Sequence, residues 1–151
     1  MKKKVLIFGA GAIGRGFIAT LFNEKNFEIH FADIDSKLVK NLNKKKNYLI
    51  GITQGNSYIK KNINFKRAFD INRDKIDIEN FDVVFSCVGP NNCYKNSEIY
   101  KNSKLLISCE NDIETVEKLK DLTGNKNIYF GIPDVITSNT APKNFLKRDK
   151  L

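Results

Sequence analysis

The chain has 151 residues, of which 41% are hydrophobic and 28% are charged. This length and this balance are typical of one globular domain with a single core. No apolar run approaches the roughly eighteen residues that a membrane-spanning helix needs, so the sequence predicts no membrane segment and we expect a cytoplasmic protein.

The formal net charge of +9 raises the question of nucleic-acid binding, because clustered basic side chains supply the phosphate contacts that dominate such binding. The lysines are, however, scattered through every segment of the chain, and arginines are few. Arginine is the better reader of bases and phosphates. We therefore expect no nucleic-acid partner.

The first part of the chain alternates between strand and helix patterns. Residues 5–8 are a continuous apolar run that ends at a glycine, which is typical of a strand buried on both faces of a parallel sheet. Residues 13–22 carry apolar side chains at helical spacing and predict one helix. Residues 27–32 predict the second strand, and Asp35 or Ser36 is placed to cap the helix that follows.

From residue 48 onward the pattern changes. Alternating apolar and polar residues over 48–69, around a Gly-Asn turn, predict a small antiparallel hairpin and a third short strand. Residues 81–88 and 105–109 predict buried strands separated by a helical stretch, and residues 112–122 and 127–132 predict a helix and a last strand. The expected apolar face of that helix comprises Ile113, Val116, Leu119 and Leu122.

Strands that alternate with helices indicate an α/β fold whose parallel strands are joined by right-handed crossovers. We predict a Rossmann-like, doubly wound, mostly parallel sheet with a small antiparallel hairpin insertion. The predicted NAD-binding domain covers residues 1–132. Residues 133–151 have the composition of a linker, or of the start of a C-terminal domain that these residues do not include.

Three glycines follow the first predicted strand with the spacing G-x-G-x-x-G. In a strand-turn-helix setting Gly9 permits the tight turn, Gly11 lets the backbone approach a pyrophosphate, and Gly14 lets the helix pack closely on the strand. Asp33 ends the second predicted strand, 33 − 14 = 19 residues beyond the third glycine, which fits the acidic residue expected roughly twenty residues on. The pattern predicts a dinucleotide site, with a tight turn that binds nothing as the alternative.

Asp33 also indicates which dinucleotide is bound. A carboxylate accepts hydrogen bonds from both ribose hydroxyls but repels a 2′-phosphate, so NAD is favoured over NADP. Asp35 competes for this role, although its position suits helix capping better. FAD shares the glycine pattern, but nothing else in the sequence indicates a flavin site.

Further candidates lie at the carboxyl ends of the predicted strands, the edge at which open α/β sheets bind ligands. Arg15 is expected near the bound phosphates, with an exposed side chain that has no ligand role as the alternative. Gly89, which precedes Pro90, lets a cofactor pass close to the backbone. Glu110 and Asn111 are expected to face the nicotinamide or the substrate, or else to cap the next helix.

The sequence offers no catalytic residue and no metal-ligand cluster. His30, the only histidine, lies in the middle of a predicted strand, where a packed side chain is favoured over a general base. Cys87, Cys93 and Cys109 are an odd number of cysteines without C-x-x-C spacing, which suits a reducing compartment. We expect them to be small buried side chains, with a role as nucleophiles or ligands as the alternative.

Four stretches of the sequence together resemble one protein family. They are "FGAGAIGRGF" at residues 8–17, "FADID" at 31–35, "VGP" at 88–90 and "SCEN" at 108–111. In this order they are similar to the mannitol dehydrogenase family of polyol dehydrogenases, and the resemblance covers most of the chain. It implies an N-terminal NAD-binding Rossmann domain. It also implies a helical C-terminal domain, absent from these residues, that binds the polyol and supplies a catalytic lysine and an Asn-x-x-His element.

The glycine pattern and the resemblance together predict the residues that bind the cofactor. They are Phe8, Gly9, Ala10, Gly11, Ala12, Ile13, Gly14, Arg15, Asp33, Val88, Gly89 and Asn111. The implied reaction is hydride transfer between NAD and a secondary alcohol of a polyol phosphate or related sugar derivative, with this chain inactive by itself. The alternative is a stand-alone NAD-binding sensor module, or a subunit that pairs with a separately encoded catalytic subunit.

Overall fold

The computed structural model describes residues 1–54 and 57–131, and its centre is a six-stranded sheet in which all neighbouring strands are parallel. The strands are β1 (Lys3–Phe8), β2 (Phe27–Asp33), β5 (Arg67–Asp70), β6 (Val83–Ser86), β7 (Leu106–Ser108) and β8 (Ile128–Phe130). Their order across the sheet is β5-β2-β1-β6-β7-β8. With the hairpin strands left out of the count, this is the 3-2-1-4-5-6 order of doubly wound dinucleotide-binding folds. The predicted fold class is confirmed.

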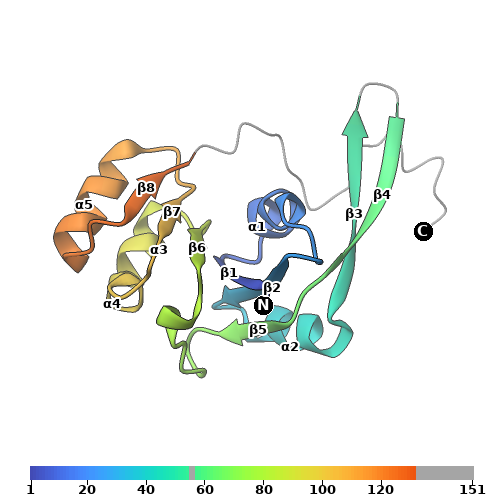
Figure 1. The fold of residues 1–151 in the computed structure, drawn as a ribbon, viewed down its shortest axis with the longest axis horizontal. Helices are drawn as coiled ribbons and strands as arrows, with labels where there is room; N and C mark the ends of the chain where they lie inside the picture. Colours follow the sequence, from blue (N-terminus) through green and yellow to red (C-terminus); the bar gives the residue numbers. More distant parts are fainter. Residues whose placement is uncertain (55–56, 132–151) are drawn as a thin grey trace.

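Helices cover the two faces of the sheet in two groups (Figure 1). On one face lie α1 (Ala12–Gly16), the 3-10 turn η1 (Ile18–Leu21) and α2 (Ser36–Lys45). On the other face lie α3 (Pro90–Lys95), α4 (Ser97–Tyr100) and α5 (Ile113–Thr123), and a further 3-10 turn, η2 (Ile78–Asn80), precedes β6. The chain therefore winds outward from β1 along one face and returns along the other.

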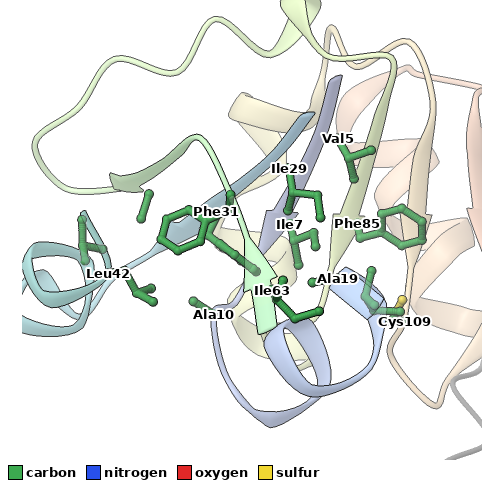
Figure 2. Packing of buried hydrophobic residues seen from close by; sticks show 14 residues of the cluster. Val5, Ile7, Ala10, Ala19, Ile29, Phe31, Leu42, Ile63, Phe85 and Cys109 are labelled. Carbon is green, nitrogen blue, oxygen red and sulfur yellow. The ribbon is translucent and has the colours of Figure 1, made fainter. Parts of the chain in front are cut away.

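Strand β1 explains why the first apolar run is continuous. All four residues from Val5 to Phe8 are fully buried. Val5 and Ile7 point into the core under α1 and α2, where Figure 2 shows them beside Phe31 and Phe85. Leu6 and Phe8 point into the opposite core, under α3 to α5. A strand covered on both faces needs apolar side chains at every position, as the sequence indicated.

The predicted hairpin is a separate two-stranded antiparallel sheet formed by β3 (Asn47–Gln54) and β4 (Ser57–Asn64). It extends away from the main sheet (Figure 1). At its base the paired residues Tyr48 and Ile63 pack on the core under α1 and α2. The centre of the predicted Gly-Asn turn, residues 55–56, lies outside the described residues.

The single helix predicted over residues 13–22 is wrong in its length. Helix α1 ends at Gly16, and Phe17 (φ −125°, ψ −63°) leaves the helical region before η1 begins. Gly14 and Gly16 both have low helix propensity, so this segment follows its tertiary contacts rather than a regular helix. The apolar spacing indicated the buried face but not the break.

A strand boundary and the buried face of a helix also differ from the prediction. The strand predicted over residues 81–88 is limited to β6, Val83–Ser86. In α5, Ile113 and Leu122 are 61% and 51% exposed, so their assignment to the core is wrong. The buried side chains of α5 are Thr115, Val116, Leu119 and Thr123.

Two threonines belong to that buried face because their hydroxyls are satisfied locally. Thr115 donates to the Asp112 carboxylate, 3.2 Å away, and Thr123 donates to the Leu119 carbonyl, 2.6 Å away. A hydrogen-bonded hydroxyl can be buried at little cost, which apolar spacing does not reveal.

None of the described helices is long and apolar enough to cross a membrane. The predicted linker, residues 133–151, lies outside the described residues.

Candidate dinucleotide-binding site

The candidate site lies at the carboxyl edge of the sheet, where β1 and β6 lie side by side. The connections from these two strands lead to opposite faces, so this is the point at which the strand order reverses and at which open α/β sheets bind ligands. Backbone hydrogen bonds hold the loops after β1 and β6 in place here. The Gly9 amide donates to the Ala32 carbonyl and the Cys87 amide donates to the Phe8 carbonyl, each at 2.8 Å.

Two of the three predicted glycines are required by the packing of this turn. Gly9 has φ +88°, and a Cβ atom there would lie 2.3 Å from the Cys87 carbonyl oxygen. A Cβ atom on Gly14 would lie 2.0 Å from the Gly9 carbonyl oxygen and 3.0 Å from a methyl group of Ile7. Gly9 therefore permits the turn, and Gly14 lets α1 approach β1 closely, as predicted.

Gly11 is different, because no atom of the described residues requires a glycine there. Within residues 1–54 and 57–131, a Cβ atom on Gly11 would meet nothing within 4 Å, and its φ of −84° is open to any residue. Gly11 is the N-cap of α1 and no side chain caps this helix, whereas Asp35 caps α2 and Asp112 caps α5. The space above Gly11 and the start of α1 is open, as a bound pyrophosphate would need.

Asp33 lies beside the glycine turn, as the sequence predicted. Its Oδ2 accepts a hydrogen bond from the Ala10 amide at 2.7 Å, and its Oδ1 accepts one from the Asp35 amide at 2.9 Å. A carboxylate has roughly four acceptor positions, so these two bonds leave capacity for ribose hydroxyls. The competing candidate, Asp35, accepts from the amides of Lys37 and Leu38 and is the cap of α2.

Arg15 is half-buried rather than exposed, and its contact with the cofactor stays a prediction. Its side chain turns back and its Nε donates to the Ala10 carbonyl, and its guanidinium lies 5.8 Å from the centre of the Tyr48 ring. The Tyr48 hydroxyl in turn donates to the Arg15 carbonyl at 2.8 Å. The hairpin thus supports the glycine turn through Tyr48. Sequence reasoning missed this residue, because the contact joins segments 33 residues apart.

On the other side of the site, Glu110 holds the loop after β6. Its Oε1 accepts hydrogen bonds from the Val88 amide at 3.0 Å and the Gly89 amide at 2.9 Å. The side chain is only 7% exposed, and burial raises the pKa of its carboxyl group, although the two amide bonds act in the opposite direction. Glu110 thus binds the protein backbone through Oε1, and its role toward the nicotinamide or the substrate stays a prediction.

The neighbours of Glu110 complete this edge. Gly89 has φ +85° and is the N-cap of α3, with Pro90 at the first helical position. Asn111 is exposed. The alternative role predicted for Glu110 and Asn111, capping of α5, is wrong, since Asp112 is the cap and accepts from the Glu114 amide at 2.9 Å.

The only histidine of the chain has a structural role. His30 is buried between Phe69 and Phe81 and bonds Glu28 Oε1 at 2.9 Å, so the prediction of a packed histidine is confirmed. Burial lowers its pKa, although the Glu28 bond acts in the opposite direction. Within residues 1–54 and 57–131, no group of three or more His, Cys, Asp or Glu side chains is placed to hold a metal ion.

Comparison with known protein families gives a match over most of the chain. The family model described as the mannitol dehydrogenase Rossmann domain matches residues 3–128. The chain is 29% identical to the mannitol-1-phosphate 5-dehydrogenase of Caldanaerobacter subterraneus, over 92% of this chain and 42% of that protein. It is 30% identical to the enzyme of the same name from Lactococcus lactis subsp. cremoris (strain MG1363), over 93% of this chain and 42% of that protein. The chain thus spans about two fifths of the length of these curated relatives.

Solved structures show the same fold at low sequence identity. An octopine dehydrogenase in complex with NADH and agmatine superposes with a TM-score of 0.69 at 12% identity, over 84% of this chain and 34% of that chain. A probable 2-dehydropantoate 2-reductase from Bacillus subtilis gives a TM-score of 0.58 at 14% identity, over 96% of this chain and 53% of that chain. At these identities the similarity shows the fold alone.

Proposed function

The chain belongs to the mannitol dehydrogenase family, and on this premise we propose that it is the NAD-binding part of an oxidoreductase that acts on a polyol phosphate. The curated relatives named mannitol-1-phosphate 5-dehydrogenase support mannitol 1-phosphate, or a related sugar derivative, as the substrate. The octopine dehydrogenase structure, which contains NADH, supports the cofactor class. The free thiols of all three cysteines fit a cytoplasmic enzyme.

The observation that carries this proposal is the open space above Gly11. The packing of the described residues does not explain why residue 11 is a glycine. It lies at the uncapped start of α1, beside Asp33, where a glycine allows a pyrophosphate to approach the backbone closely. In the proposed complex the pyrophosphate binds the start of α1. Asp33 accepts hydrogen bonds from the adenosine ribose, and its negative charge disfavours the 2′-phosphate of NADP.

NAD, when bound, supplies the acceptor for the hydride that leaves the alcohol carbon. The residues of this chain bind and orient the cofactor. Glu110 keeps Val88 and Gly89 in place at the edge, because its Oε1 accepts hydrogen bonds from both of their amides. We propose that the groups that hold the polyol and remove its proton belong to a further domain or a partner subunit, in line with the two fifths of the relatives' length that this chain spans.

Calorimetric titration with NAD tests this proposal when Gly11→Ala is compared with the wild-type chain. The added methyl group meets no atom of the described residues within 4 Å, so we expect only the cost of a poorer N-cap, about 1 kcal/mol or less. It occupies the space proposed for the pyrophosphate, so we expect NAD binding to weaken by roughly tenfold or more. Wild-type affinity in the folded variant would contradict the proposed site.

Gly124→Ala is the matched control. Gly124 has φ +68°, ends α5 far from the glycine turn in the sequence, and likewise has no atom within 4 Å of an added Cβ. This substitution is expected to cost about 1 kcal/mol of stability because alanine disfavours that backbone conformation. It should leave the affinity for NAD unchanged. We also expect no NADH formation when this chain alone is mixed with NAD and mannitol 1-phosphate.

A further inference from the structure

The three cysteines lie on different faces of the sheet, which separates two of them from the third. Cys87 follows β6 and Cys109 follows β7, and both side chains belong to the core under α1 and α2 (Figure 2 shows Cys109). Cys93 lies in α3 on the opposite face, fully buried, where its sulfur is 3.2 Å from the Ser86 hydroxyl. The sheet thus stands between Cys93 and the other two.

Cys87 and Cys109 are neighbours across two paired strands. Ser86 pairs with Ser108, and the Cys109 amide continues this ladder by donating to the Ser86 carbonyl at 2.9 Å, so the two cysteines occupy the next position on each strand. Neighbouring strands lie about 4.8 Å apart. This spacing is within the Cα–Cα range of roughly 4.4–6.8 Å that a disulfide spans. The two side chains also belong to the same hydrophobic cluster.

We propose that Cys87 and Cys109 form a redox modification site, in which a hydroperoxide converts the two thiols into a reversible disulfide. The Cys109 thiolate attacks one oxygen of the peroxide, whose O–O bond breaks, and Cys109 becomes a sulfenic acid while the other oxygen leaves with a proton as water or an alcohol. The Cys87 sulfur then attacks the Cys109 sulfur. The S–O bond breaks and water leaves with the Cys87 proton, so two thiols are oxidised and one peroxide is reduced.

The surroundings assign the two roles. The hydrogen bond from Cys87 lowers the pKa of Cys109, while the same bond and burial raise the pKa of Cys87. Cys109 is therefore the thiol that ionises first and attacks the peroxide. On its other side, the position next to Cys109 on the path of β8 is Gly131, whose amide donates to the Ser108 carbonyl at 2.9 Å. The Ile107 side chain fills the place beside Gly131, whereas Cys87 is half-buried, so a small peroxide can reach the pair from the Cys87 side.

Oxidation at this position should affect the candidate dinucleotide site, an expectation that rests on the proposed function. The Cys87 carbonyl lies so close to the glycine turn that a Cβ atom on Gly9 would come within 2.3 Å of it. Val88 and Gly89, the next residues along the chain, form the opposite side of the site. Drawing the two sulfurs to bonding distance pulls the end of β6 toward β7, and we expect it to weaken NAD binding roughly fivefold or more.

The test treats the reduced chain with one equivalent of hydrogen peroxide, blocks the remaining thiols with N-ethylmaleimide, and maps the modified cysteines by mass spectrometry. We expect a Cys87–Cys109 crosslink with Cys93 carrying the maleimide, and full reversal by dithiothreitol. Cys87→Ser and Cys109→Ser should each abolish the crosslink, and Cys93→Ser is the control that should retain it. Because Cys93 is fully buried, the peptide map of the wild-type chain decides the outcome if that control does not fold.

A crosslink that includes Cys93, oxidation to sulfinic acid without a crosslink, or three free thiols after peroxide would each overturn the proposal. NAD titration of the oxidised and reduced chains is read separately. A reversible loss of affinity in the wild type, but not in Cys109→Ser, supports coupling to the dinucleotide site, and equal affinities refute the coupling. If the reduced chain does not bind NAD at all, the proposed function fails while the peptide map still decides the redox site.

Discussion

Replacing Glu110 tests how the carboxyl edge of the sheet is held in place. The Glu110 side chain is almost fully buried and accepts hydrogen bonds from two consecutive backbone amides, those of Val88 and Gly89. Glu110→Ala removes the acceptor and leaves both amides without this partner. Glu110→Gln removes the charge but keeps a carbonyl oxygen that can accept the same two bonds.

The expected magnitudes follow from this difference. Each buried amide that loses its partner costs about 1–3 kcal/mol, and relief from burying a charge offsets part of the sum. We therefore expect Glu110→Ala to lower the free energy of unfolding by about 2–4 kcal/mol, or the melting temperature by roughly 5–15 °C for a chain of this length. Glu110→Gln should stay within about 1 kcal/mol of the wild type at pH 7.

The assay is urea unfolding of the three proteins as a function of pH. The pKa of Glu110 in the folded state is raised above its ordinary value of 4.5. At a pH just above 4.5 the folded state therefore keeps this proton while the unfolded state loses it, which stabilises the folded state. This contribution to stability is lost as the pH rises through the folded pKa. Glu110→Gln should lack this pH dependence. Equal destabilisation by both substitutions, or no effect of Glu110→Ala, would refute the account of the two amide bonds.

Three further predictions concern other parts of the fold. Gly14→Ala should lower the free energy of unfolding by about 2 kcal/mol or more, and with it the melting temperature, because the new Cβ atom would lie 2.0 Å from the Gly9 carbonyl oxygen. An unchanged melting curve would contradict this packing. Burial lowers the pKa of His30, so its contribution to stability is present above its ordinary pKa of 6.5 and is lost as the pH falls through the folded pKa. His30→Phe should reduce this acid sensitivity in thermal melts. A pH profile of the melting temperature that stays the same in this variant would contradict the role of His30. Asp35→Ala should cost about 1 kcal/mol in urea unfolding through loss of the α2 cap, with NAD binding unchanged; a loss of NAD binding would instead return Asp35 to the candidate site.

The sequence indicated the fold and the glycine turn because both depend on local patterns. A run buried on both faces, such as Val5 to Phe8, has to be apolar throughout. Gly9 and Gly14 are set by a backbone conformation and a close approach that no other residue tolerates. The spacing from the third glycine to Asp33 then follows from the length of one helix and one strand, and the structure places Asp33 beside the turn.

Side-chain partners between distant segments could not be predicted in this way. Glu110 was expected to face a ligand or cap a helix, and its inward bonds depend on how the ends of β6 and β7 lie next to each other. The Tyr48 bond to Arg15 depends on where the hairpin packs. One signal was present for the thiol pair: the dipeptide Ser-Cys lies at or next to the carboxyl end of two consecutive predicted strands, and the pairing of Ser86 with Ser108 places Cys87 and Cys109 at equivalent positions.

The most direct test of the proposed function is a calorimetric titration of the wild-type chain with NAD and, separately, with NADP. The account predicts saturable binding of NAD at one site, and binding of NADP that is weaker by roughly tenfold or more because Asp33 repels the 2′-phosphate. No heat of binding with NAD, or an affinity for NADP equal to or greater than that for NAD, would contradict the assignment of this edge of the sheet as an NAD site.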